Sequence, residues 1–235
     1  MQLFYSESIN DTEDQFAFNK DESKHIVRVL RKKEGQELLV TNGKGAIFLC
    51  NITLANDKNC IVTILKKTTQ ELPKYKLHLA VAPTKMNDRY EWFLEKATEI
   101  GVSEITPLIC AHSERKVVKI DRFNKIIQSA LKQSLNAYFP VLNDPISFKD
   151  FMSQTEINNK LIAHCEDDKK HSLKHALKPK TDYLILIGPE GDFSSKEIEL
   201  ALKHNFKPVS LGETRLRTET AAIVACHSVA FVNEL

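Results

Sequence analysis

A glycine loop near the C-terminal end of the chain has the residue types of a ligand-binding turn. Residues 184–187 form an apolar run that stops at Gly-Pro-Glu-Gly-Asp-Phe, residues 188–193. Ser194 and Glu197 then have the spacing of a capping box, so a helix is predicted to begin there. A strand followed by a glycine loop and a helix is a usual arrangement for holding a nucleotide-like ligand, because glycines let the main chain approach the ligand closely.

The charges of this loop argue against a polyphosphate ligand. A phosphate-binding P-loop needs G-x-x-x-x-G-K-[ST], but the residues after Gly188 supply no lysine, and Glu190 and Asp192 would repel a triphosphate. The loop does not match the G-x-G-x-x-G dinucleotide fingerprint either. S-adenosylmethionine is a better match, since it has a cationic sulfonium and no phosphate. Taken alone, the loop is more simply a tight turn, because Pro and Gly end many strands.

Two further predicted strand ends carry residues of the same kind. Segment 211–222 reads as strand, glycine, short basic stretch and helix start, and segment 163–167 follows another apolar run. Their polar residues are His164, Glu166, Arg215, Arg217 and Thr218, the last a predicted helix N-cap. Ligands of open α/β sheets sit beyond the carboxyl ends of the strands. Three such ends therefore predict one composite pocket.

The predicted elements change in kind near residue 70. Residues 1–70 read as a small β-rich unit with a helix capped by Asp21 and a hairpin whose turn is Asn42-Gly43. From residue 77 onward, strands alternate with helices, which predicts an α/β fold with a parallel sheet. The strands are predicted at 77–83, 104–110, 160–165, 183–188 and 208–212, and the helices at 89–101, 119–137, 195–204 and 218–232.

The last predicted helix is apolar nearly all round. Such a helix must be buried, against its own sheet or against a second subunit. His227 within it is expected to be a buried histidine. Trp92, in the helix predicted at 89–101, is expected to lie in the core.

Composition places the chain among ordinary globular proteins. The sequence is 42% hydrophobic and 27% charged. No apolar run approaches the ~20 residues needed to span a bilayer. The N-terminus lacks the pattern of a signal peptide, and the five scattered cysteines suggest neither a zinc site nor a disulfide framework. The expectation is a cytoplasmic protein with no membrane segment and no metal.

Two basic segments favour contact with a nucleic acid, although the formal net charge is only +2. Segment 24–33 carries five basic residues and no acid, and segment 112–125 carries five basic residues against two acids. Each segment alone is most simply a solvated face. Two of them in one chain make RNA or DNA contact plausible.

Six stretches of the chain resemble the ribosomal small-subunit RNA methyltransferase E family. They are HIVRVLR (25–31), EKATEIGVSEITPL (95–108), SERK (113–116), ALKQSLNAYFP (130–140), IGPEGDF (187–193) and LGETRLRTETA (211–221). The two glycine loops in this order make the resemblance specific. It departs at Asp192, where the family often has glycine, at Leu135-Asn136, where it often has an arginine, and at Thr214, where it usually has arginine.

The resemblance implies a fold and an activity. Residues 1–70 would form a PUA-like β-barrel that binds RNA. Residues 74–235 would form a SPOUT α/β domain whose C-terminal trefoil knot holds S-adenosylmethionine. The protein would be a homodimer that methylates N3 of one uridine in small-subunit (16S) ribosomal RNA on the assembled small ribosomal subunit. A SPOUT enzyme acting on transfer RNA and a non-catalytic RNA-binding protein of ribosome assembly are the alternatives.

The resemblance also implies the site residues. The implied cofactor-binding residues are His164, Glu166, Leu186, Ile187, Gly188, Pro189, Glu190, Gly191, Leu211, Gly212, Leu216, Arg217, Thr218 and Ala221. The implied RNA-binding residues are Lys24, Arg28, Arg31, Lys32, Arg115, Gln133 and Ser134, although the helical pattern alone makes Ser134 a packing residue. Uridine N3 must lose a proton, so Arg217 is expected to stabilise the uracil anion and Glu219 or Glu166 to accept the proton. The alternative role for Arg217 is an ion pair with a carboxylate.

Overall fold

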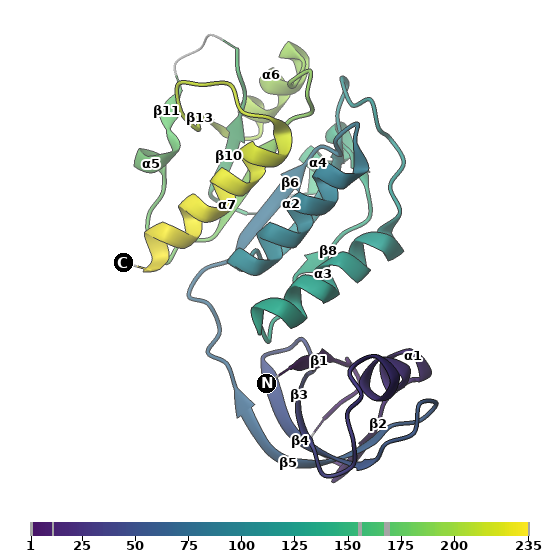
Figure 1. Ribbon diagram of the computed structural model, residues 1–235. Coiled ribbons are helices and arrows are strands. Elements are labelled where there is room, and N and C mark those ends of the chain that lie inside the picture. Colours follow the sequence, from purple (N-terminus) through teal and green to yellow (C-terminus); the bar gives the residue numbers. More distant parts are fainter. Residues whose placement is uncertain (1, 11, 155–156, 167–169, 235) are drawn as a thin grey trace. The chain divides into compact units, whose positions relative to one another are not determined.

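The computed structural model describes residues 2–10, 12–154, 157–166 and 170–234, and the chain forms two compact units. The first unit comprises Met1–Leu72 together with Leu131–Phe139, and the second comprises Pro73–Ala130 and Pro140–Leu235. Each unit has its own sheet (Figure 1).

The first unit is built on a five-stranded sheet in the order β1-β3-β4-β5-β2. Its strands are β1 (Leu3–Tyr5), β2 (Gln15–Ala17), β3 (Glu37–Thr41), β4 (Ala46–Leu54) and β5 (Ile61–Thr69). β1 pairs in parallel with β3, and the other pairs are antiparallel. Alternate residues of β4 are buried, as expected for a strand with one face on a core. That core includes Phe4, Leu38 and Phe48.

The helical segment of this unit begins earlier than predicted. Asn19, not Asp21, is the N-cap of α1 (Lys20–Lys24), because its side chain accepts a hydrogen bond from the Glu22 backbone N–H. Asp21 lies instead in the first helical turn, where a negative charge is also favourable. α1 continues into one π-helical turn, η1 (His25–Val29).

The predicted hairpin is confirmed, but its turn is longer than the two residues predicted. β3 and β4 are joined by residues 42–45, and Gly43 and Gly45 have φ angles of +73° and +96°. Segment 137–139 packs on this loop, with the Gly45 N–H donating to the Ala137 carbonyl at 2.9 Å and the Phe139 N–H donating to the Gly43 carbonyl at 2.9 Å. A Cβ at Gly45 would clash with the Tyr138 hydroxyl. Close packing against segment 137–139 therefore sets the conformation of this loop.

The second unit contains a parallel eight-stranded sheet, as the sequence predicted. Its strand order is β11-β13-β10-β12-β6-β7-β8, and β9 also pairs with β7. The strands are β6 (Leu77–Val81), β7 (Glu104–Ile109), β8 (Val141–Leu142), β9 (Ile146–Ser147), β10 (Lys160–Ala163), β11 (His171–Ser172), β12 (Tyr183–Ile187) and β13 (Lys207–Ser210). Every residue of β6 and β12 is buried, because helices cover both faces of the sheet.

Helices α2 and α7 lie side by side on one face of this sheet (Figure 1). α4 and α6 contribute to a core on the other face that includes Phe151, Ile162 and Ile198. The helices of the unit are α2 (Asn87–Ile100), α4 (Phe148–Gln154), α5 (Leu173–Ala176), α6 (Ser195–Lys203) and α7 (Thr218–Glu234), together with α3 (Ile120–Ser134) as far as Ala130. The predicted end of α2 at Gly101 and the predicted capping box of α6 are both confirmed.

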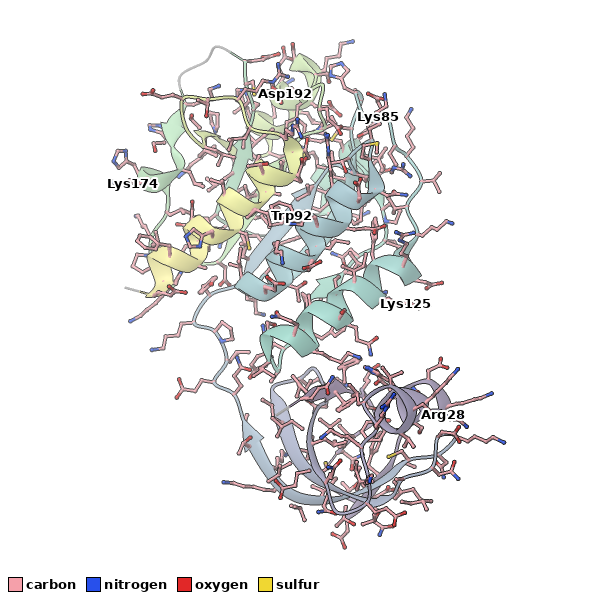
Figure 2. All side chains as sticks on the ribbon, in the orientation of Figure 1. Arg28, Lys85, Trp92, Lys125, Lys174 and Asp192 are labelled. Carbon is pink, nitrogen blue, oxygen red and sulfur yellow. The ribbon has the colours of Figure 1, made fainter. Side chains whose placement is uncertain are left out.

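Two expectations about buried side chains are wrong. Trp92 is 44% exposed on α2 (Figure 2), and His227 is exposed on α7. Phe231, one turn after His227, is also exposed. Ala222, Ala225, Cys226 and Val229 form the inward stripe of α7 at helical spacing, so Phe231 and His227 fall outside that stripe. No described helix is long and apolar enough to cross a membrane.

Candidate functional site

The loop after β12 and the first turn of α6 are bonded to three other loops at the carboxyl edge of the parallel sheet. The Lys85 N–H, after β6, donates to Glu190 Oε1 at 2.9 Å, and the Cys165 N–H, after β10, donates to Asp192 Oδ2 at 2.7 Å. The Ala111 N–H, after β7, donates to Glu197 Oε1 at 2.8 Å. Lys85 and Asp192 lie at the same end of the sheet in Figure 2. The two acids of the glycine loop therefore bind neighbouring main-chain groups.

Asp192 holds a backbone conformation that usually needs glycine. Its φ angle is +63°, a left-handed conformation that favours glycine. Aspartate tolerates this conformation when its short side chain bonds locally. Here one carboxylate oxygen accepts from the Phe193 N–H at 2.8 Å and the other from the Cys165 N–H.

The start of α7 is joined to the glycine loop through Thr218. The Thr218 hydroxyl is buried and donates to the Gly188 carbonyl at 3.0 Å. The prediction that Thr218 is an N-cap is wrong, because the Arg217 carbonyl already accepts from the Ala221 N–H at 2.8 Å. Thr218 is instead the first residue of α7. A Cβ at Gly188 would lie 3.1 Å from the Phe193 ring, which leaves no room for a larger residue. The Arg215 guanidinium donates to the Glu190 carbonyl at 3.3 Å.

A cavity of about 280 Å³ opens at this edge, between the segments that follow β10 and β13. Its size is close to the lower end of the range for small-molecule sites, about 300–1,000 Å³. Five of the predicted cofactor residues line it: His164, Leu211, Gly212, Leu216 and Ala221. The other nine do not line the cavity, although Gly188 and Glu190 are bonded to Thr218 and Arg215 as described above.

The lining suits a cofactor that has an aromatic base and no phosphate. Ala163, Val209, Leu211 and Leu216 supply apolar surface. Gly212 has a φ angle of +150°, and a Cβ there would meet no atom within 4 Å, so a side chain would project into open space. Lys170, which lines the cavity on the β10 side, donates to the carbonyls of His164 and Glu166 at 2.9 and 2.7 Å. These features fit S-adenosylmethionine.

Cys165 also lines this cavity, but it is not an activated nucleophile. Partial burial, with a smaller contribution from Asp192, raises the pKa of its thiol above the usual value. A thiol with a raised pKa is protonated at neutral pH and reacts poorly. The site therefore lacks the activated thiolate that covalent chemistry through this residue would need.

Glu219, in the first turn of α7, is a nearly buried carboxylate. Its side chain is only 9% exposed, and Oε2 has no hydrogen-bond partner among the residues that the structure describes. Oε1 lies 3.8 Å from Arg89 Nε, on the neighbouring helix α2. A buried carboxylate with an unsatisfied oxygen is costly, which marks a place where a ligand or a proton is expected. No pattern in the sequence points to Arg89, because its partner is 130 residues away and only the packing of α2 on α7 brings the two together.

The other predicted acid–base residues are in different situations. Glu166 is exposed, and its Oε1 accepts from the Ser195 hydroxyl at 2.8 Å. Arg217 is exposed, and no ion pair to it is found within the described part of the chain, so its alternative role as a carboxylate partner is not observed.

The predicted RNA-binding residues lie in three separate segments of the chain. Arg115 holds the loop after β6, with its guanidinium donating to the carbonyls of Thr84 and Lys85. In the first unit, Arg28 pairs with Asp57, and Lys32 donates to the Glu37 carbonyl at 3.0 Å. Lys24 and Arg31 are exposed. Gln133 and Ser134 group with the first unit rather than with the sheet that carries the cavity.

Comparison with known families identifies this architecture. The family model of the RNA methyltransferase domain matches residues 70–230, and that of the RNA methyltransferase PUA domain matches residues 18–65. A ribosomal RNA small subunit methyltransferase E from Rickettsia conorii is 32% identical over 216 residues, which are 89% of this chain and 86% of the relative. The chain belongs to the ribosomal RNA small subunit methyltransferase E family. The resemblance seen in the sequence is thereby confirmed.

Solved structures agree with the family assignment. A "probable rRNA-methyltransferase" from Porphyromonas gingivalis is 40% identical, with a TM-score of 0.91 over 100% of this chain and 99% of that one. A ribosomal RNA small subunit methyltransferase E from Neisseria gonorrhoeae, bound to S-adenosyl methionine, is 25% identical, with a TM-score of 0.88 over 99% and 98% of the two chains. Among the described residues, no group of three or more His, Cys, Asp or Glu could hold a metal ion.

Proposed function

We propose that this member of the methyltransferase E family uses S-adenosylmethionine to methylate N3 of a uridine in small-subunit (16S) ribosomal RNA, on the assembled subunit. The observation that carries the proposal is the cavity between the segments after β10 and β13, with the buried Glu219 in the first turn of the adjoining helix. A relative that is similar over nearly its whole length is bound to S-adenosyl methionine, which supports the choice of cofactor.

Main-chain and apolar groups of the two segments hold the cofactor. Leu211, Leu216 and Ala221 provide the walls for its adenine, and Gly212 leaves space that a side chain would fill. The bound cofactor supplies an electrophilic methyl group. Thr218, through its bond to Gly188, fixes the first turn of α7 against the glycine loop. Fixing these groups before the reaction lowers the entropic barrier to an in-line transfer.

Glu219 accepts the uridine proton in this proposal. Glu219 Oε2 is buried and has a free lone pair, whereas Glu166 Oε1 already accepts from Ser195. Arg89 stays near Oε1 and holds the carboxylate in place. Arg217, whose guanidinium has no described ion pair, stabilises the uracil anion that remains after the proton leaves. A donor in that role is worth roughly 3–4 kcal/mol in transition-state energy.

The finer architecture and setting belong to the same proposal. The first unit would be the PUA-like RNA-binding domain, the C-terminal segments of the second would form a trefoil knot around the cofactor, and the protein would act in the cytoplasm. A homodimer is supported by two exposed apolar side chains on adjacent helices, Trp92 on α2 and Phe231 on α7. A contiguous exposed apolar patch marks an interface, and in the proposed dimer both side chains would belong to one.

The proposal is tested by methyl transfer. The protein is incubated with S-adenosylmethionine and small ribosomal subunits from cells that lack the modification, and the RNA is digested and analysed by mass spectrometry. We expect N3-methyluridine in the RNA of the subunits and none in a parallel reaction with transfer RNA. Intact cofactor binding without any methylated subunit RNA would refute the choice of substrate.

A further inference from the structure

A second hollow lies at the opposite, amino edge of the parallel sheet. An inner cavity of about 530 Å³ is lined by His78 and Glu104, at the starts of β6 and β7, and by Phe151 of α4. An outer cavity of about 880 Å³ is also lined by His78 and Glu104 and by the start of β12. The two cavities therefore meet. Both are larger than the cavity at the carboxyl edge, and the proposed methyl transfer uses neither.

The floor of the inner cavity is a hydrogen-bonded polar network. His78 Nε2 lies 2.8 Å from the Thr106 hydroxyl oxygen, and the Asn143 amide donates to Thr106 Oγ1 and to Glu104 Oε1 at 2.8 and 2.7 Å. His78 Nδ1 lies 3.7 Å from the same Glu104 oxygen. The network fixes the Glu104 carboxylate, and no hydrogen bond to Glu104 Oε2 is found among the described residues.

A break in the edge strand creates the inner cavity. β8 pairs with Glu104 and Ile105, and β9 pairs with Leu108 and Ile109, so residues 143–145 bulge away opposite the middle of β7. Asp144 and Pro145 of this bulge line the cavity. Ile146, Phe151 and Ile157 give it apolar walls.

The residues that line the outer cavity carry more positive than negative charges. Lys74, Lys76 and Lys180 line it, against the two carboxylates Glu104 and Asp182. All three lysines are exposed, and none forms an ion pair with another residue that the structure describes. Asp182 Oδ1 accepts from the Lys76 backbone N–H at 2.6 Å, which occupies that oxygen. Free ammonium groups at the mouth of a pocket attract phosphate.

We propose that this hollow binds a nucleotide, with its base in the inner cavity and its phosphate on Lys74, Lys76 and Lys180. Apolar walls suit the faces of a base, and a fixed carboxylate suits a base edge that carries N–H donors. Guanine is the best match, because its N1–H and N2–H₂ can donate to the two oxygens of one carboxylate. The nucleotide is either a residue of an RNA chain or a free nucleotide. The RNA source rests on the proposed function, whereas the free source does not.

Calorimetry on the full-length protein with GMP, UMP and inorganic phosphate is the test. We expect GMP to bind more tightly than UMP or phosphate. Glu104→Gln should weaken GMP binding about tenfold, the loss of roughly one strong hydrogen bond. A Lys74→Ala/Lys76→Ala/Lys180→Ala variant should weaken it at least as much and reduce its salt dependence. Lys203→Ala, on the exposed end of α6, is the matched control and should bind GMP normally.

Binding of S-adenosylmethionine, measured on every variant, reports folding and the other site separately. If the variants lose GMP binding but keep the wild-type KM for small subunits, the ligand is a free nucleotide. If the variants raise that KM at least about fivefold with unchanged cofactor affinity, the ligand is a nucleotide of the RNA. GMP binding that equals phosphate binding, together with an unchanged KM in all variants, overturns the proposal.

Discussion

Arg89 of α2 and Glu219 of α7 face one another across two neighbouring helices, with Arg89 Nε 3.8 Å from Glu219 Oε1. The second carboxylate oxygen is buried and has no hydrogen-bond partner among the described residues. The arginine is 37% exposed and the glutamate 9% exposed, so one member of the pair reaches solvent while the other does not. In this pair, Glu219 is the group that would accept a proton, and Arg89 is the group that would hold the Glu219 carboxylate in place.

Replacing Glu219 by glutamine tests whether Glu219 is the proton acceptor. Glu219→Gln should lower kcat by about 10²–10⁴-fold, the usual contribution of a general base, and leave the affinity for S-adenosylmethionine unchanged. Arg89→Ala should lower kcat less, because the carboxylate is kept and only the group that orients it is lost. Single-turnover methylation assays measure both effects. Glu199→Gln, on the exposed face of α6, is the control; equal rates for Glu199→Gln and Glu219→Gln would contradict the assignment.

A substitution at Gly212 tests whether the cofactor binds in the cavity between the segments after β10 and β13. Gly212→Val should reduce the affinity for S-adenosylmethionine at least about a hundredfold, because Gly212 lines the cavity, a side chain there would take up open space, and the φ angle of +150° disfavours it. Calorimetry measures the affinity. Gly35→Val is a matched control in the first unit, since Gly35 also has a positive φ and nothing near its Cβ position. If both variants bind normally, the cavity is not the cofactor site.

The loop at residues 42–45 of the first unit should contribute to the stability of the protein. Gly45→Ala should destabilise the protein by roughly 1–3 kcal/mol, because the added Cβ meets the Tyr138 hydroxyl and the φ angle is positive. Chemical denaturation measures the effect. In the double variant Gly45→Ala/Tyr138→Ala, the steric part of the loss should disappear, so the two changes should not be additive. Additive losses would show that the close approach has no energetic consequence.

The buried His78 should make the stability of the protein depend on pH. Burial lowers its pKa below the ordinary value of 6.5, and Glu104 only partly opposes this effect. The unfolded chain therefore binds more protons than the folded chain below about pH 6.5, so the free energy of unfolding should fall as pH drops from 6.5 toward the lower folded pKa. Stability should be insensitive to this residue above that window.

Denaturation midpoints measured in steps of pH check this prediction. His78→Gln should flatten the fall below pH 6.5, whereas His175→Gln, at an exposed position on α5, should leave the fall unchanged. Identical slopes for the wild type and both variants would show that His78 does not contribute to the pH dependence.

The sequence alone determined the features that depend on near neighbours in the chain. The capping box of Ser194 and Glu197 and the end of α2 at Gly101 were predicted, because their bonds span at most four residues. The apolar runs at residues 160–165 and 183–188, which form β10 and β12, correctly predicted a parallel sheet. The order of the two glycine loops correctly predicted the family.

Only the tertiary structure decided which distant residues meet. Residues 131–139 group with the first unit because Ala137 and Tyr138 bond to Gln70 and Gly45, and no periodicity in the sequence encodes those contacts. Glu190 and Asp192 looked like ligand-facing acids, but each accepts a main-chain N–H from another loop. The pair of Arg89 and Glu219 exists because α2 packs on α7. A residue's chemistry can be read from its type, but its partner is fixed only when the helices and strands pack.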